Sequence, residues 1–409
     1  MVAAAARPSA TGAGRRILMI VENLPVPFDR RVWQEARTLT AAGYRVSVIC
    51  PTGKGYEARR ETIDGIDIYR HTLPLEAHGP RGYFVEYGAA LFHECRLALR
   101  VAFGTGFDAI HACNPPDLIF LVALPFKWFA GKKFVFDHHD INPELYEAKF
   151  NRRGDLFWRL LGWFERRTFA TADIVISTNE SYRDIAIGRG GKDPADVFVV
   201  RSGPSLDRVV IGAPDPALRK GRDFLLGYVG VIGQQEGIQY LLEAMRILVI
   251  ERGRADIQCA IVGGGPAAAA MEALSISLGI AAYVDFTGRV PDELMLRVLN
   301  TADVCVNPDE FNAMNDKSTM NKIVEYMALG KPIVQFELTE GRVSAADASL
   351  YARPNDARDL ADQIEALLAD PARRAAMGAA GRRRVEETLE WRHQEPVLLD
   401  AYARLFATR

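Results

Sequence analysis

The stretch Asn315-Asp-Lys-Ser-Thr-Met-Asn-Lys-Ile-Val-Glu-Tyr-Met-Ala-Leu-Gly-Lys-Pro-Ile-Val-Gln335 combines a helix signal with a strand signal. Residue types that cap helices crowd its start, Gly330 stands where a helix would stop, and the run from Pro332 to Phe336 is typical of a strand. We therefore expect a helix from about Thr319 to Leu329, followed directly by a strand. An ordinary amphipathic helix with a good cap has the same pattern.

One side of this expected helix is polar. Residues three, four and seven apart share a helix face, which groups Ser318, Asn321, Lys322 and Glu325. The start of a helix offers free N–H groups and a partial positive charge, which suit an anion such as a diphosphate. Glu325, about two turns further in, has acceptor oxygens for the vicinal hydroxyls of a sugar. The pattern is compatible with a helix that binds a nucleotide, with phosphates at its tip and ribose alongside.

Composition limits the class of protein. The chain has 409 residues, enough for two or three domains, and its 49% hydrophobic and 25% charged content is that of a soluble globular protein. A net charge of −2 argues against nucleic acid as the main partner. The five cysteines are scattered without a CxxC spacing, so neither a disulfide framework nor a zinc site is indicated. Residues 1–14 are typical of a disordered tail, and no apolar run would span a bilayer. We expect a cytoplasmic protein.

Strand-like runs alternate with helical stretches in both halves of the chain. This alternation predicts an α/β fold with parallel sheets and crossover helices. We expect two doubly wound, Rossmann-like domains facing across a cleft, with ligands at the carboxyl ends of the strands. The expected boundaries are an N-terminal domain over 15–205, a C-terminal domain over 206–385, and a last helix over 386–409 that returns to the N-terminal domain.

Several motifs occur in a fixed order in the C-terminal half. They are Gly227-Tyr-Val-Gly-Val-Ile-Gly-Gln-Gln-Glu-Gly237 and the helix after it, Ile261-Val-Gly-Gly-Gly-Pro266, Val284-Asp-Phe-Thr-Gly-Arg-Val290, Ala302-Asp-Val304, and the helix that carries Glu325. In the N-terminal half, Phe28-Asp-Arg-Arg31 opens a helix and Phe136-Asp-His-His-Asp140 ends a strand. From Ile17 to about Phe406 the chain resembles the retaining nucleotide-sugar glycosyltransferases of family 4, which have the two-domain GT-B fold.

The resemblance implies roles for particular residues. Catalytic contacts are implied for His139 and Asp316, and acceptor contacts for Arg30 and Arg31, although a solvated charge pair is an equal reading of the two arginines. Either His138 or His139 faces the site, and the family pattern favours His139; a structural histidine pair is the alternative. The implied donor site contains Gly230, Gly233, Arg289, Lys317, Ser318, Thr319, Met320, Asn321, Lys322 and Glu325. For the two loop glycines, a tight strand–helix turn is the alternative.

The chain departs from the family pattern at the sites of charge. Lys317 stands where the family usually has an acidic residue for the donor sugar, a role that passes to Asp316 or is lost. Val231 and Glu236 stand where the family has an Arg and a Lys for the diphosphate. The replacement cations are Lys317, Lys322, Arg201 or Arg342. A lysine at a helix start is unfavourable by a few tenths of a kcal/mol unless an anion binds there.

No Asp-x-Asp triplet stands out, so we expect no metal and no cofactor besides the nucleotide-sugar substrate. The expected partners are that nucleotide sugar and a glycan or lipid-linked acceptor in cell-surface polysaccharide or glycolipid synthesis. Two aromatic and basic stretches, 81–87 and 157–167, are either core helices or a surface that docks on the inner face of the plasma membrane. A nucleotide-sugar epimerase of the same fold and a non-catalytic nucleotide-sugar binding protein are the competing functions.

Overall fold

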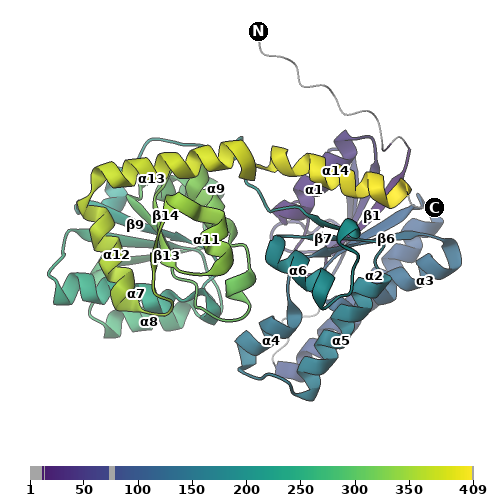
Figure 1. The fold of residues 1–409 in the computed structure, drawn as a ribbon, viewed down its shortest axis with the longest axis horizontal. Helices are drawn as coiled ribbons and strands as arrows, with labels where there is room; N and C mark the ends of the chain where they lie inside the picture. The colour runs from purple at the N-terminus through teal and green to yellow at the C-terminus, as the bar shows by residue number, and fades with distance from the viewer. Residues whose placement is uncertain (1–11, 13, 73–78, 408–409) are drawn as a thin grey trace, which may run out of the picture. The chain divides into compact units, whose positions relative to one another are not determined.

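The computed structural model describes residues 12, 14–72 and 79–407, and for residues 79–87 the backbone alone. The chain divides into two compact units (Figure 1). Unit 1 runs to Glu147 and continues over Arg152–Arg201 and from Gln394 onward, whereas unit 2 contains Ala148–Asn151 and Ser202–His393. The boundaries expected from the sequence, after residues 205 and 385, lie close to the divisions after Arg201 and His393. Apart from residues 12 and 14, the expected N-terminal tail lies outside the described residues.

Unit 1 is built on a mostly parallel sheet. Its strands are β1 (Arg16–Ile20), β2 (Arg45–Pro51), β3 (Arg60–Ile63), β4 (Ile66–His71), β5 (Ala109–Cys113), β6 (Lys133–His138), β7 (Ile174–Ser177) and β8 (Val197–Val199). Their spatial order is β3-β4-β2-β1-β5-β6-β7-β8, and the β3–β4 pair is antiparallel. The order reverses between β1 and β5, which makes the loops after these two strands the switch point of the sheet.

The helices of unit 1 are α1 (Arg30–Ala41), α2 (Gly79–Phe103), α3 (Phe120–Ala130), most of α4 (Asn142–Phe150), α5 (Leu156–Thr171), α6 (Glu180–Gly188) and residues 394–407 of α14 (Trp391–Ala407). One apolar cluster joins α2, α3, α5 and α6 to the sheet, through residues such as Leu97, Val122, Phe169 and Ala186. These four helices therefore form one layer. Tyr402 of α14 packs instead on Tyr44, with ring centroids 5.4 Å apart.

Unit 2 is built on a parallel sheet. Its strands are β9 (Phe224–Val229), β10 (Ile257–Val262), β11 (Val284–Gly288), β12 (Val304–Asn307), β13 (Ile333–Phe336) and β14 (Ser349–Ala352), in the order β11-β10-β9-β12-β13-β14. Its helices are α7 (Ile238–Arg246), α8 (Ala268–Ser277), α9 (Asp292–Thr301), α10 (Asn321–Ala328), α11 (Thr339–Ala345), α12 (Ala357–Ala369) and α13 (Pro371–Arg384). The prediction of two doubly wound α/β domains is confirmed.

Local sequence accounts for these elements. Every residue of β10 is buried, as expected for a central parallel strand that is covered on both faces. Helix α12 begins where the Asp356 carboxylate accepts hydrogen bonds from the N–H groups of Arg358 and Asp359. Its buried residues Leu360, Ile364, Leu367 and Leu368 follow the helical repeat. In the described ranges, none of the helices has the length and apolar character needed to cross a membrane.

The helix expected from Thr319 to Leu329 is shorter at its start than predicted. Helix α10 begins at Asn321, and its N-cap Met320 provides no side-chain hydrogen bond. Residues 315–317 form a separate 3-10 turn before α10. The hydroxyl of Ser318, directly after that turn, donates to the carbonyl of Met314 at 2.8 Å. The predicted stop at Gly330 is confirmed: its φ is 65°, a conformation that favours glycine.

Candidate active site

The sheet of unit 2 reverses its order between β9 and β12, so the loops after these strands form its ligand-binding edge. The loop after β9 begins at Gly230 and the loop after β12 at Pro308, and α10 follows the latter. Most of the residues predicted for the donor site follow the carboxyl ends of β9, β11 and β12. The topology thus groups them at one edge, while their individual roles stay predictions.

Glycines in the loops after β9 and β10 let the two loops pack on each other. The Gly230 N–H donates to the carbonyl of Val262 at 3.0 Å. A Cβ at Gly263, whose φ is 135°, would overlap the carbonyl oxygen of Gly230. A Cβ at Gly233 would lie 3.0 Å from the side chain of Gln235, a contact that a small movement relieves. Loop packing therefore explains the backbone approach at Gly230, and its place in the donor site stays a prediction.

Lys322 of α10 is buried in a cage of acidic and aromatic groups. Its Nζ lies 2.7 Å from Oδ1 of Asp309 and 3.1 Å from Oε2 of Glu236. The same nitrogen lies 5.0 Å from the ring centroid of Tyr228, in a cation–π contact. The polar side predicted for this helix is buried at Lys322, which is 9% exposed and meets residues that follow β9 and β12.

Two carboxylates around one ammonium give this cage an excess of negative charge. Burial raises the pKa of Asp309 to about 7, against the pull of Lys322 and with a further rise from Glu236. Burial alone would lower the pKa of Lys322, but Asp309, Tyr228 and Glu236 outweigh it and hold that pKa well above its usual value. Lys322 is therefore a permanent cation. It pairs with Glu236, which occupies a position where the resemblance leads one to expect a lysine.

Glu325, one helical turn beyond Lys322, has a partner that the sequence did not reveal. Oε1 of Glu325 accepts a hydrogen bond from Nη2 of Arg208 at 2.5 Å. Nη1 of the same guanidinium donates to Oδ2 of Asp292, at the start of α9, at 3.1 Å. Arg208 belongs to the segment between β8 and β9, outside the motifs quoted from the sequence. Its guanidinium holds the Glu325 carboxylate in one orientation.

Asp316 and Lys317 lie in the 3-10 turn before α10, not at the start of that helix. Oδ1 and Oδ2 of Asp316 accept from the backbone N–H and the hydroxyl of Thr339, at 2.8 and 3.0 Å. Asp316 thus fixes the beginning of α11. The helix-dipole argument for Lys317 is wrong in its premise, since this residue ends a short turn. Its half-buried side chain has other contacts within the chain.

The remaining predicted donor residues differ in accessibility. Ser318 is buried, whereas Thr319 and Met320 are half-buried, and Asn321 at the tip of α10 is exposed. Arg289 directly follows β11 and is exposed.

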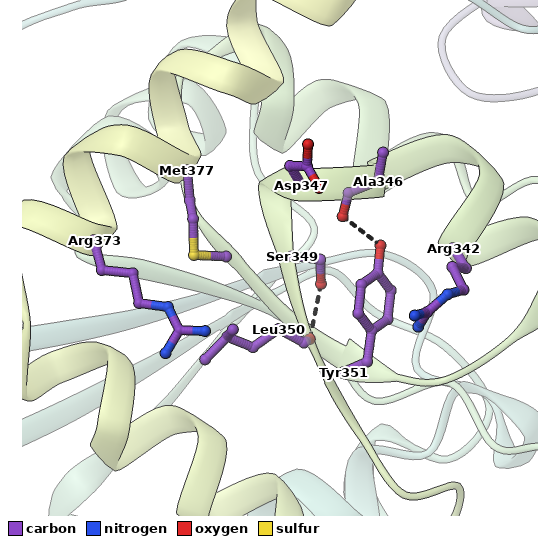
Figure 2. A pocket seen from close by; sticks show the side chains of 8 residues that line it. All are labelled: Arg342, Ala346, Asp347, Ser349, Leu350, Tyr351, Arg373 and Met377. Carbon is purple, nitrogen blue, oxygen red and sulfur yellow. Dashed lines mark hydrogen bonds between the residues drawn. The ribbon is translucent and has the colours of Figure 1, made fainter.

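Arg342, considered above as a replacement cation, lies at a cavity of unit 2. This cavity of about 470 Å³ is lined by Arg342, Ala346, Asp347, Ser349, Leu350, Tyr351, Arg373 and Met377 (Figure 2). The Arg342 guanidinium carbon lies 4.6 Å from the ring centroid of Tyr351, and Nη1 is 2.8 Å from the Glu337 carboxylate. None of the residues implied for the donor site lines this cavity.

In unit 1, Arg31 requires a correction. It lies in the first turn of α1, it is 8% exposed, and its guanidinium has internal partners. Nη2 is 2.9 Å from Asp137 and 3.1 Å from Glu35, and Nη1 donates to the carbonyl of Val200 at 2.7 Å. A solvated charge does not fit this buried position, and the acceptor contact of Arg31 stays a prediction. Arg30, the neighbouring residue, is exposed.

The histidine pair at the end of β6 divides into a core residue and an accessible one. His138 is fully buried against Phe136, Phe169 and Tyr182. Burial first, and then the charge of Arg189, lowers the pKa of His138 to about 3, so its ring is neutral. His139 is 17% exposed, which makes it the accessible member of the pair.

One ring nitrogen of His139 contacts both members of the Arg31–Asp137 pair. Nε2 lies 2.5 Å from Oδ2 of Asp137 and 2.8 Å from Nε of Arg31. The tautomer of the ring decides whether this nitrogen donates to Asp137 or accepts from Arg31. The backbone N–H of His139 donates to Oδ1 of Asn114 at 2.7 Å. The ring is thereby held at the switch point of the sheet, next to the loop after β5.

Asp137 is the centre of a buried network that links α1, β5, β6 and α14. Burial would raise the pKa of its carboxyl, but Arg31 and His139 hold that pKa well below its usual range. The pKa of Glu35 is raised well above its usual value, by burial and by the negative charge of Asp137. His111 contacts two members of this network. Its Nδ1 lies 2.8 Å from the hydroxyl of Tyr402 in α14, and its Nε2 lies 3.4 Å from Oδ2 of Asp137. The sequence did not predict that these residues, Tyr402 included, form one network.

His111, Cys113 and Asp137 bring ligand atoms within 4.8 Å of one another, a spacing that a metal ion could use. Two observations weigh against that use. Asp137 is already bonded to the Arg31 guanidinium, and the pKa of the Cys113 thiol is raised well above its usual value by burial and by Asp137. A protonated thiol beside a guanidinium is a poor metal ligand. The trio is better described as part of the ion-pair network.

Family models match both units. The model "Glycosyltransferase Family 4" matches residues 29–208, and "Glycosyl transferases group 1" matches residues 223–370. A curated relative, the 2-deoxystreptamine glucosyltransferase of Streptomyces kanamyceticus, is 28% identical over 44% of this chain and 46% of its own length. The chain spans about half the length of the first curated relatives that it matches.

Solved structures agree on the fold. A sucrose-phosphate synthase from Thermosynechococcus elongatus matches 97% of this chain and 100% of its own, with a TM-score of 0.79 and 19% identity. Anabaena Alr3699/HepE in complex with UDP-glucose matches 95% and 99%, with a TM-score of 0.70 and 14% identity. Two doubly wound units with these neighbours define a GT-B-type protein. With its two family models, the chain belongs to the family 4 glycosyltransferases.

Proposed function

We propose that the protein is a retaining glycosyltransferase that moves a sugar from a nucleoside-diphosphate sugar to a hydroxyl of a glycan or lipid-linked acceptor. Its proposed setting is the synthesis of a cell-surface polysaccharide or glycolipid. The observation that carries the proposal is the position of Glu325 on α10, the helix whose Lys322 contacts Glu236 of the loop after β9 at the switch point of unit 2. In the structural neighbour from Anabaena, a protein of this fold binds UDP-glucose.

In the proposed donor site, the diphosphate and the ribose contact different parts of α10. The free N–H groups at the start of α10 would meet the diphosphate, and Glu325 would accept hydrogen bonds from the ribose hydroxyls. Arg208 supports this second role, since its hydrogen bond at 2.5 Å fixes the carboxylate. Cationic help for the leaving diphosphate is proposed for Lys317 and Arg289, both outside the Lys322 cage.

We propose that transfer needs neither a metal ion nor an added cofactor. Because helix N–H groups and cations meet the leaving group in this proposal, transfer should not need a divalent ion. His139 is proposed to contact the donor sugar, and Arg30 the acceptor. Turnover that survives EDTA supports the metal-independent reaction. Turnover lost in EDTA and restored by magnesium or manganese contradicts it.

One observation favours a second candidate, a protein that binds nucleotide sugars without transfer. Glu236 places a carboxylate where the resemblance leads one to expect a cation, and Lys322 is already paired with it at 3.1 Å. Such a site would bind the donor but would stabilise the leaving diphosphate less. A nucleotide-sugar epimerase is the other alternative of the same fold.

The experiment that separates these functions starts from purified full-length chain and radiolabelled UDP-, GDP-, ADP- and TDP-sugars. A membrane glycolipid extract and soluble glycans serve as acceptors. Transfer of label with the anomeric configuration of the donor supports the retaining transferase. Tight binding without transfer on any acceptor supports the binding protein. Exchange at the second carbon of the sugar without acceptor supports the epimerase.

A further inference from the structure

Three neighbouring helices of unit 1 expose large apolar side chains on their outer faces. Helix α3 packs against both α2 and α5, and all three send their inner faces into the same core cluster (Figure 1). Their outer faces carry Phe92, Leu99 and Phe103 on α2, Leu121, Trp128 and Phe129 on α3, and Leu156 and Trp163 on α5. We call these eight residues the aromatic face.

The exposure of the aromatic face is large and regular. Phe129 is 88% exposed, Phe103 89% and Trp128 70%. On α2, Phe92, Leu99 and Phe103 follow one another at intervals of seven and four, which places them on one side of the helix. A monomeric protein rarely exposes a contiguous set of such residues unless something covers it.

The exposed charges on the described parts of these three helices have one sign. The exposed charged residues of the described parts of α2, α3 and α5 are Arg96, Arg100, Arg159, Arg166 and Arg167. The two carboxylates in the same parts, Glu94 and Glu165, are fully buried. The next helix, α6, exposes Glu180 and Asp184, so the one-signed surface ends there. Exposed aromatic rings on helices whose exposed described charges are all arginines match an anionic lipid surface in both polarity and charge.

We propose that the aromatic face of α2, α3 and α5 docks unit 1 on an anionic bilayer surface. The rings enter the boundary between headgroups and acyl chains, and the five arginines contact lipid phosphates. The helices lie on the surface and do not span it, in agreement with the absence of a spanning helix among the described residues. The second of the two aromatic and basic stretches in the sequence supplies Trp163 and three of the arginines. The side chains of the first, 81–87, lie outside the described residues.

The test is flotation of the full-length chain with vesicles of phosphatidylcholine alone or mixed equally with phosphatidylglycerol. We expect binding to the anionic vesicles near physiological ionic strength, where the Debye length is about 8 Å, and much weaker binding in 1 M salt. Trp128→Ser/Phe129→Ser should reduce the bound fraction roughly tenfold, because binding scales with buried apolar area. Arg159→Glu/Arg166→Glu should abolish the preference for anionic lipid.

Matched controls come from unit 2. Ile276 of α8 is 69% exposed, and Arg383 of α13 is also exposed. Ile276→Ser and Arg383→Glu should leave vesicle binding unchanged, and circular dichroism should show that all variants are folded. Absence of binding to anionic vesicles overturns the proposal. So does a dimer in light scattering that Trp128→Ser/Phe129→Ser converts to monomer without any vesicle binding, because the face would then cover a second copy of the chain.

Discussion

The guanidinium of Arg208 and the carboxylate of Glu325 lie 2.5 Å apart, although 117 positions separate them in the chain. Arg208 is 28% exposed and Glu325 13%, so the pair is partly shielded from water. A carboxylate held in this way keeps its orientation before any ligand arrives. The pair therefore connects the segment before β9 to the residue that we propose for ribose binding.

Replacing Glu325 should weaken nucleotide binding directly. Glu325→Gln keeps the shape but removes a charge-assisted acceptor, so binding should lose on the order of 1.5–3 kcal/mol. Isothermal titration with the preferred nucleoside diphosphate measures the loss. Asp292→Asn is the matched control, because it changes the other partner of Arg208 and leaves the Glu325 carboxylate in place. Parental affinity in Glu325→Gln would rule out the ribose role.

The Lys322 cage should be essential for the stability of unit 2. Lys322→Met leaves Asp309 and Glu236 without their cation, and loss of one member of a buried ion pair costs about 3–5 kcal/mol. Thermal unfolding should show a lower midpoint, and adding Asp309→Asn should restore part of it. Arg353→Met provides the control, since the 72% exposed Arg353 pairs at the surface. A midpoint unchanged by Lys322→Met would contradict the ion-pair account.

His138 should make the protein sensitive to acid. Its folded pKa of about 3 lies below the usual 6.5, so the unfolded chain binds its proton first as the pH falls. Its contribution to stability is complete above pH 6.5 and is lost as the pH falls toward 3. His138→Phe should therefore become more stable relative to the parent by up to about 1.4 kcal/mol per pH unit below about pH 6. Denaturant titrations from pH 8 to 4 test this, and parallel stability curves for the two proteins would exclude it.

Lys317 and Asp316 should affect different parts of the donor. Lys317→Ala is expected to weaken binding of the nucleoside diphosphate more than binding of the nucleoside. Asp316→Asn is expected mainly to impair use of the intact sugar donor. Because Asp316 also holds Thr339, a drop in the unfolding midpoint of Asp316→Asn would show that its effect is structural. Equal affinities of parent and Lys317→Ala for the diphosphate would leave Lys317 without a phosphate role.

Sequence patterns predicted the fold well because its elements are encoded locally. The buried run of β10 and the stop at Gly330 follow from apolar periodicity and glycine conformation within a few residues. The predicted start of α10 was wrong because Ser318 lies between two helical turns. Its hydroxyl donates to the carbonyl of Met314 in the earlier 3-10 turn and does not cap α10.

The charges of the site were harder to predict because their partners are distant in the chain. Arg31 meets Asp137 across 106 positions, and Lys322 meets Glu236 across 86. Helical periodicity assigns Lys322 to a polar face, and only the fold shows that this face meets buried carboxylates. Accessibility separates His138 from His139 for the same reason, since both end one strand and only packing distinguishes them.

The central claim is that unit 2 binds a nucleoside-diphosphate sugar through α10. The most direct measurement is a thermal-shift panel of UDP-, GDP-, ADP- and TDP-sugars on the parent and on Glu325→Gln. At a hundred times its dissociation constant, the correct donor should stabilise the parent by roughly 2.7 kcal/mol. At the same concentration it should stabilise Glu325→Gln distinctly less. Absence of a shift with every nucleotide sugar, or an equal shift in both proteins, would contradict the account.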